Sequence, residues 1–303
     1  MKATDWKGIF ALLCLLNLSA CQQEPSSSEL WAEFSGTNAM EHAQNLVALG
    51  PRPAGSEALE RARKYLIGKL EAAGWRVQRQ AFTAVTPRGE LEFSNLIARH
   101  EAVTEETLQE KRCFIATHYE TKYYSGITFV GANDGTSGAA ALLEMARVLS
   151  LNQALAKRID LIFFDGEEAL VNFSESDGLY GSRHFADELR ESGRSRLYDF
   201  GILWDMIGDR ELSITLPADS PATLAKGIFD AAATLGYRQF FSFMDTAILD
   251  DHVPINRVGI NCIDVIDFDY PHWHTAEDTL DKLSPESLKI TGQVTLRYLE
   301  SLR

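Results

Sequence analysis

The sequence predicts an α/β fold with three layers: a mixed, mostly parallel central sheet flanked by helices on both faces. Two observations support this fold class. Short apolar runs alternate with segments of helical periodicity, an order typical of parallel sheets, and the runs lie at 112–117, 159–164, 200–206 and 262–266. These runs are apolar along most of their length, as strands are when helices cover both faces of their sheet.

The segment before the first of these runs is expected to form two helices and a hairpin. Apolar residues recur at three- and four-residue steps over 38–49 and 56–74, and Ser56 is placed to cap the second helix. Strand-like residues at 75–84 and 91–98 flank a turn that contains proline and glycine, which is typical of a hairpin.

Four more helices complete the alternation. They are expected at 137–149, 179–189, 221–235 and from Pro285 to the C-terminus. The first begins with glycine and alanine, so it can approach a sheet closely, and proline suits the first turn of the last.

Composition indicates a globular chain and excludes one class of partner. Of 303 residues, 45% are hydrophobic and 24% charged, and no Pro/Gly-rich linker interrupts 31–303, which we interpret as one domain. The net charge is −14 and no cluster of Lys or Arg occurs, so a nucleic-acid partner is not expected.

The N-terminus has the features of an export signal. Lys2 and Lys7 precede an apolar run over 8–18 that is too short to span a bilayer. The following Leu-Ser-Ala-Cys resembles the bacterial lipobox, which implies a signal peptide at 1–20, acylation of Cys21 and a tether over 21–30. The protein would then be exported and anchored to the cell envelope, facing the periplasm or the surface. A plain signal peptide cut nearby is the alternative.

Two further cysteines, Cys113 and Cys262, lie in apolar, strand-like runs. Such positions favour buried thiols, because cysteine is among the residues most often buried. Because an exported protein can form disulfides, a bond between these two cysteines is the alternative.

Polar residues cluster where the predicted strands end. His118 and the Glu167-Glu168 pair follow apolar runs, and Asp205 lies at the end of another. Ligands of α/β sheets bind at that edge. Further polar residues of this kind are Asp134, Asp250, Asp251, His252 and His274. A single aspartate here is better explained as a helix cap, but the joint occurrence favours a metal site. Imidazole nitrogen and carboxylate oxygen are ligands of zinc.

The Glu167-Glu168 pair is the sharpest local signal. Two adjacent side chains leaving a strand end can diverge. One is then free to bind a metal while the other acts as a general acid or base.

These motifs resemble the clan of co-catalytic zinc aminopeptidases. The resemblance covers roughly 38–302 and rests on Gly-Pro-Arg-Pro-Ala-Gly-Ser at 50–56, Gly-Ala-Asn-Asp at 131–134, the glutamate pair, Asp205 and His274. Within the clan, the glutaminyl cyclases are the more similar branch. The stretches that support this are Ala-Thr-His-Tyr-Glu-Thr-Lys-Tyr at 116–123, the spacer from the glutamate pair to Leu-Tyr-Gly-Ser-Arg-His at 179–184, Asp-Asp-His-Val-Pro at 250–254 and Trp-His-Thr at 273–275.

The resemblance implies a role for each site residue. Asp134, Glu168 and His274 would hold one Zn²⁺, with Glu167 as the proton shuttle. Asp205 and Asp250 would form an acidic hydrogen-bond network beside the substrate. The remaining candidates are Phe173, Leu249 and Trp273 for the substrate pocket, and His118 and Asp251 for a second metal or for support of the first.

Three departures from the branch concern the pocket and the metal count. Phe173 stands where a tryptophan is common, Leu249 where animal members have glutamine, and Glu120 where most of the clan has aspartate. His118 is a metal ligand in the two-zinc aminopeptidases, but it is retained in the cyclases, which usually hold a single zinc. The resemblance therefore implies one zinc, and two is the alternative.

The expected activity is the zinc-assisted cyclisation of an N-terminal glutamine to pyroglutamate with release of ammonia. Peptides or proteins with N-terminal glutamine would be the substrates. A metallo-aminopeptidase that removes N-terminal residues is the main alternative, and a surface lipoprotein that only binds peptides is a third hypothesis.

Overall fold

The computed structural model describes Met1, residues 29–174 and residues 176–302. Residues 2–20 of the predicted signal peptide, Cys21 and most of the predicted tether lie outside these residues. The side chain of Leu30 is buried, and its backbone N–H donates to a carboxylate oxygen of Glu300. Among the helices of the described residues, none combines the length and apolar character needed to cross a membrane.

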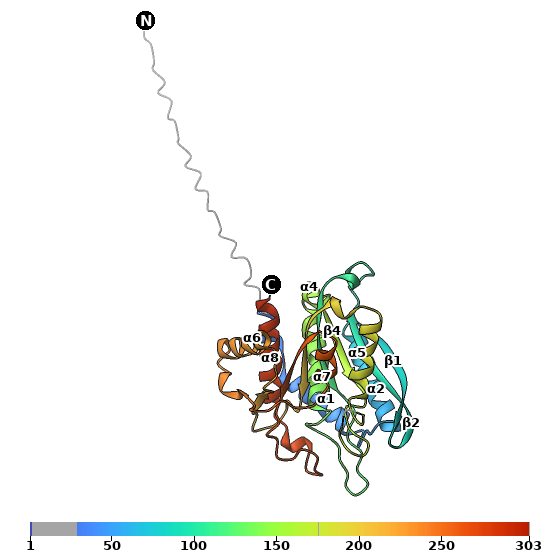
Figure 1. Cartoon of the computed structure of the whole chain (residues 1–303). Coiled ribbons are helices and arrows are strands. Elements are labelled where there is room, and N and C mark those ends of the chain that lie inside the picture. Colours follow the sequence, from blue (N-terminus) through green and yellow to red (C-terminus); the bar gives the residue numbers. More distant parts are fainter. Residues whose placement is uncertain (2–28, 175, 303) are drawn as a thin grey trace.

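A mixed sheet forms the middle layer of the described chain (Figure 1), with the strand order β1-β2-β4-β3-β5-β8-β6-β7. The central strands β4, β3, β5 and β8 run parallel, whereas β2 is antiparallel to β4 and β6 is antiparallel to β8. The predicted mixed, mostly parallel sheet is therefore confirmed. The bounds are β1 Trp75–Thr86, β2 Gly89–His100, β3 Arg112–His118, β4 Ile159–Phe164, β5 Tyr198–Asp205, β6 Ile214–Leu216, β7 Phe241–Phe243 and β8 Asn261–Ile266.

Helices cover both faces of this sheet, which confirms the three predicted layers. The larger apolar cluster joins one face to α1 Gly36–Val47, α2 Glu57–Ala72, α3 Ser137–Ser150, α6 Ala222–Thr234 and α8 Pro285–Ser301. A second cluster joins the opposite face to α5 Tyr180–Glu191 and α7 His252–Arg257. The short helix α4 (Gln153–Ala156) precedes β4.

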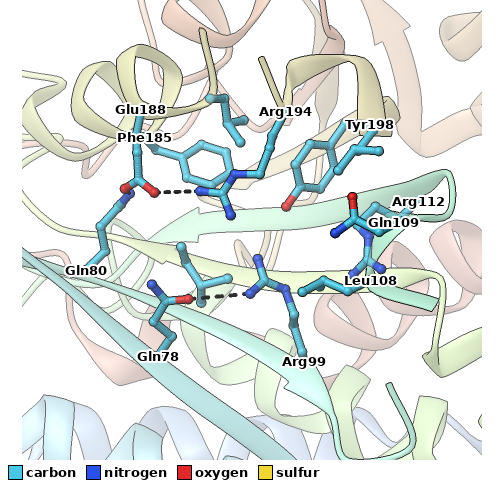
Figure 2. Close-up of a pocket in the computed structure, with 13 residues that line it drawn as sticks. Gln78, Gln80, Arg99, Leu108, Gln109, Arg112, Phe185, Glu188, Arg194 and Tyr198 are labelled. Atoms are coloured by element: carbon cyan, nitrogen blue, oxygen red, sulfur yellow. Dashed lines mark hydrogen bonds and ion pairs between the residues drawn. The ribbon is translucent and has the colours of Figure 1, made fainter. Parts of the chain in front are cut away.

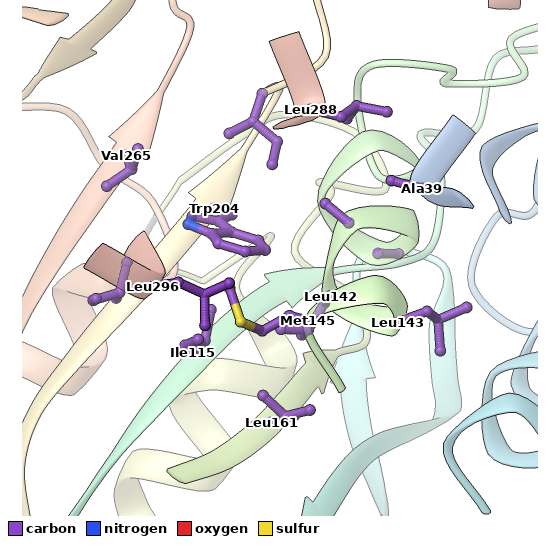
Figure 3. Packing of buried hydrophobic residues seen from close by; sticks show 14 of the residues in the cluster. Ala39, Ile115, Leu142, Leu143, Met145, Leu161, Trp204, Val265, Leu288 and Leu296 are labelled. Carbon is purple, nitrogen blue, oxygen red and sulfur yellow. The ribbon is translucent and has the colours of Figure 1, made fainter. Parts of the chain in front are cut away.

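The core centres on Trp204 of β5, which is fully buried. Figure 3 shows its ring among side chains of β3, α3 and α8, including Ile115, Met145 and Leu296. The indole N–H donates to the hydroxyl of Thr295 at 3.2 Å, so the one polar atom of the ring is satisfied.

The first turn of α3 lies directly on the sheet, as its small residues predict. A Cβ atom at Gly138 would stand 2.2 Å from the hydroxyl oxygen of Thr117 and 3.0 Å from the carbonyl oxygen of Trp204. Only glycine fits there. The close approach places the loop before α3, and Asp134 within it, over the ends of β3 and β5.

Cys113 of β3 and Cys262 of β8 are buried and unpaired. The structure thus agrees with the predicted buried thiols and not with the alternative, a disulfide between them.

Candidate active site

The carboxyl ends of the parallel strands bring the predicted polar residues to one edge of the sheet. His118 is the last residue of β3, Asp205 the last of β5, and Glu167-Glu168 follow β4 by two residues. Parallel strands end at the same edge, so these side chains meet although they are far apart in sequence.

Three of these side chains form the predicted metal-binding group. Asp134, Glu168 and His274 each offer a ligand atom, and these atoms lie within 4.8 Å of one another. His274 Nε2 is 3.1 Å from Glu168 Oε1 and 3.3 Å from Asp134 Oδ2. The ring therefore faces two carboxylates that converge on the same point.

This group fits a divalent cation. The buried Asp134 Oδ2 accepts no hydrogen bond of good geometry, although His274 Nε2 lies 3.3 Å away. Burial lowers the pKa of His274, but its contacts with Asp134 and Glu168 outweigh this and raise that pKa to about 9. Two carboxylates and one imidazole thus surround a point that attracts positive charge, and nitrogen and oxygen donors of this kind are used by zinc.

His118 lies on the other side of Asp134. Its Nε2 is 3.2 Å from Asp134 Oδ1 and 3.2 Å from Asp205 Oδ1. Burial lowers the pKa of His118, yet the hydrogen bonds to Asp134 and Asp205 hold it well above its usual range. Asp134 therefore lies between two imidazoles, with His118 and Asp205 either supporting it or forming a second ligand set.

Glu167 diverges from its neighbour, as an adjacent pair at a strand end can. It lines the main cavity. Burial, and to a smaller extent the nearby charge of Glu168, raises its pKa well above the usual range. A glutamate with a raised pKa suits general acid–base work near neutral pH.

Asp250 and Asp251 precede α7 and are both buried. Asp250 lines the cavity, and burial raises its pKa to about 6. Burial and the charge of Asp250 raise the pKa of Asp251 well above its usual range. Asp251 does not line the cavity or belong to any of the described metal-binding groups, so its predicted role as a second-metal ligand has no geometric support.

A cavity of about 430 Å³ opens over these residues. The predicted pocket residues Phe173, Leu249 and Trp273 all line it. The Trp273 ring stacks on His274 with centroids 4.2 Å apart, so it both walls the cavity and fixes the imidazole. The apolar lining continues through Val171, Met206, Ile248, Ile266 and Phe268.

Backbone strain is concentrated near the site. Only three non-glycine residues in the described chain have positive φ: Leu179 (54°), Met206 (48°) and His274 (56°). Met206 follows Asp205, and His274 belongs to the metal-binding group. Left-handed backbone costs free energy for such residues, so the packing around the site must hold it in place.

A second, smaller cavity of about 50 Å³ lies on the α5 side of the sheet (Figure 2). Three arginines line it, and each already has a carboxylate partner: Arg99 and Arg112 contact Asp160, and Arg194 contacts Glu188. We interpret this cluster as a structural ion-pair network around the buried Asp160.

Comparison with known proteins identifies the family. The profile of peptidase family M28 matches residues 95–299, which is more than half of the chain. The chain belongs to peptidase family M28.

Its relatives within M28 place it near the cyclases. It is 32% identical to the glutaminyl-peptide cyclotransferase of Gloydius blomhoffii, with 84% of this chain and 78% of the relative covered. The solved glutaminyl cyclase of an Acidobacteriales bacterium superposes with a TM-score of 0.81 at 34% identity, covering 93% of this chain and 98% of the other. A Zn-dependent exopeptidase from Parabacteroides distasonis also superposes, with a TM-score of 0.78 at 27% identity and coverage of 88% and 98%. The predicted resemblance to the cyclase branch is confirmed.

Lys122 is a residue of this M28 site whose contact the sequence did not predict. Its ammonium group lies 2.7 Å from Glu168 Oε2, and it lines the cavity. Glu168 thus turns one oxygen toward His274 and the other toward Lys122. The Thr-Lys-Tyr stretch after His118 carries no local signal for this contact, because it depends on how the loop folds back.

Proposed function

We propose that this protein cyclises the N-terminal glutamine of peptides or proteins to pyroglutamate with release of ammonia. The observation that carries the proposal is the meeting of Glu167 with the group Asp134, Glu168 and His274 in one cavity. The similarity to named glutaminyl-peptide cyclotransferases over most of the chain supports this activity for the site.

The reaction joins two groups of the same substrate residue. The neutral α-amine attacks the γ-amide carbon, a C–N bond forms, the bond to the amide nitrogen breaks, and ammonia leaves. Because nucleophile and electrophile are tethered, most of the catalytic work is positioning and stabilisation of charge.

Glu167 moves the proton in this scheme. Its carboxylate takes a proton from the attacking amine and delivers it to the departing nitrogen, which suits its raised pKa. Asp205 and Asp250 line the same cavity and provide acceptors for the N–H groups of the amine. A Zn²⁺ ion held by Asp134, Glu168 and His274 would supply Lewis-acid polarisation of the γ-carbonyl.

An aminopeptidase activity is the second candidate. The group His118, Asp134 and Asp205 offers a further ligand set beside the first, and one structural neighbour is named a Zn-dependent exopeptidase. In that reaction a water molecule attacks the first peptide bond with Glu167 as base.

A mass-resolved assay separates these activities. Purified, zinc-loaded protein is incubated with one peptide that begins with glutamine and one that begins with leucine. Loss of ammonia from the glutamine peptide is expected. Release of free leucine, with the glutamine peptide shortened, would instead establish the aminopeptidase, and binding without any product would leave only a peptide-binding protein.

The Glu167→Gln variant tests the proton transfer. Activity should fall by about 10²- to 10⁴-fold, the usual size of a general acid–base contribution. The zinc held by Asp134, Glu168 and His274 should stay bound, because that group does not include Glu167. Glu90→Gln on the exposed β1–β2 hairpin is the matched control and should keep full activity.

We also propose that the protein is exported and anchored to the cell envelope through an acylated Cys21. The signal-like residues 1–20 and the Leu-Ser-Ala-Cys motif support this. In cells fed a labelled fatty acid, the wild-type protein should carry the label and sediment with membranes, whereas Cys21→Ala should lose the label. Unlabelled wild-type protein released in soluble form would contradict the anchor.

A further inference from the structure

A second buried aspartate lies behind Asp250. Asp264 is on the central strand β8, and its neighbours in that strand are apolar. Its side chain is fully buried on the face of the sheet covered by α5 and α7, the face to which Cys262 also points. A carboxyl group in such a strand costs free energy unless its oxygens find partners.

The contacts of Asp264 are with two other titratable groups. Asp250, His252 and Asp264 each bring one atom within 4.8 Å of the other two, and the Asp264 side chain lies in hydrogen-bond range of Asp250. His252 Nδ1 is 3.5 Å from Asp264 Oδ2, which is too long for a good hydrogen bond. As an ionised group, Asp264 has no hydrogen-bond donor for either oxygen.

The close approach of two carboxylates has one simple solution. Ionised carboxylates only accept hydrogen bonds, and two of them in contact inside a protein repel each other, so one must hold a proton. Asp250 already receives the backbone N–H of Asp251 on Oδ1, which stabilises its anion. Asp264 has no such donor. Burial, and to a smaller extent the charge of Asp250, raises its pKa well above the usual range.

The remaining neighbour does not supply a positive charge. Burial lowers the pKa of His252, and neither of its ring nitrogens has a hydrogen-bond partner. A neutral imidazole therefore packs beside Asp264 and leaves the proton on the carboxyl group.

We propose that Asp264 is a positioning residue: it carries a proton and donates a hydrogen bond from its O–H to the carboxylate of Asp250, which it holds toward the cavity. Asp250 lines that cavity, where the substrate amine binds under the proposed function. The inference rests on that function only for its effect on catalysis, because the proton itself is a property of the folded protein.

Two substitutions of Asp264 distinguish a hydrogen-bond donor from a charge. Asp264→Asn keeps a neutral N–H donor of the same shape, so kcat/KM should stay within about threefold of the wild-type value. Asp264→Ala removes the donor, and kcat/KM should fall by about 10- to 100-fold, the range for a hydrogen bond to a charged group. KM for the glutamine peptide should rise in Asp264→Ala, whereas a mere loss of folded enzyme would lower kcat and leave KM unchanged.

Infrared spectroscopy tests the proton without reference to activity. In protein labelled with ¹³C-aspartate, the difference spectrum of wild type minus Asp264→Asn at neutral pH should contain the carbonyl band of one protonated carboxyl group. The difference is needed because burial also raises the pKa of other aspartates, such as Asp251. That result stands even if the wild-type protein proves not to cyclise glutamine, so failure of the proposed function and failure of this inference can be told apart.

Three results would overturn the inference. Inactivity of Asp264→Asn equal to that of Asp264→Ala, with both folded, would show that a negative charge is required. Absence of that band from the difference spectrum would show that Asp264 is ionised. Loss of one bound zinc equivalent from Asp264→Asn, measured by elemental analysis, would show that Asp250, His252 and Asp264 hold a metal instead.

Discussion

At the scale of single residues, much of the site follows from where polar side chains stand relative to apolar runs. The strand-end positions of His118, Glu168 and Asp205 could be read from the sequence, because parallel strands end at a common edge. Lys122 and Asp264 could not. Lys122 reaches Glu168 only because its loop folds back, and Asp264 is an isolated acid inside an apolar strand, whose burial depends on α7.

Asp267 gives a prediction of pH dependence at this scale. Burial raises its pKa to about 7, and only one of its oxygens, which accepts from the Ser213 N–H, has a partner. Between the unfolded pKa of about 3.9 and about 7, the unfolded chain releases this proton while the folded chain keeps it. The free energy of unfolding should therefore fall as pH rises through this window, by at most about 4 kcal/mol.

Asp267→Asn should remove that contribution. Urea unfolding at the two ends of the window should show the variant losing less stability than the wild type as pH rises. The exposed Asp230→Asn serves as control, since its side chain pairs only with Lys226 at the surface. Equal slopes for wild type and Asp267→Asn would show that Asp267 is ionised throughout.

At the scale of elements, the long periodic segments were predictable and the short ones were not. The helices α1, α2, α3 and α8 and the strands β3, β4 and β8 lie within a few residues of their expected bounds. The strands β6 and β7 have three residues each, the helix α4 has four and the helix α7 has six. Such segments are too short for a hydrophobic periodicity to be recognised. Their partners elsewhere in the fold determine them.

The contact between α3 and the sheet makes a prediction for Gly138. Gly138→Ala should destabilise the protein by about 1–3 kcal/mol, because the added methyl group meets Thr117 and the backbone of Trp204. Activity should fall as well, since the shift moves Asp134. Thermal melting and zinc content measure the two effects.

Gly68 of α2 is the matched control. It is exposed, and a Cβ atom there would meet nothing within 4 Å. Gly68→Ala should raise stability by about 0.5–1 kcal/mol through helix propensity alone. If both alanine variants behaved alike, the close approach of α3 would not be the cause.

At the scale of the whole molecule, an excess of negative charge is gathered around the metal-binding group. The chain carries a net charge of −14, and the carboxylates of Glu167, Asp205 and Asp250 line one cavity. Burial raises the pKa of each. A bound cation offsets this charge, so metal binding should stabilise the folded state.

Metal removal is the prediction at this scale. A ligand present at about a thousand times its Kd stabilises the fold by about 4 kcal/mol, which corresponds to roughly 10 °C in Tm for a chain of this size. Chelation should lower the Tm of the wild type by this amount, and zinc should restore it. Asp134→Asn should show no response to zinc, whereas the exposed control Asp230→Ala should respond fully; a zinc response in Asp134→Asn would contradict the ligand assignment.

The separation between the strand ends and the loops around the cavity has a consequence for how such an enzyme diversifies. The carboxylates of Asp205 and Glu168 depend on the sheet, whereas Val171, Phe173 and Leu249 stand on connecting segments and are partly exposed. Substitutions at these three positions alter the walls of the cavity and leave the sheet untouched. New substrate preferences can therefore evolve, or be selected in the laboratory, at little cost to the fold and with the proton-transfer chemistry intact.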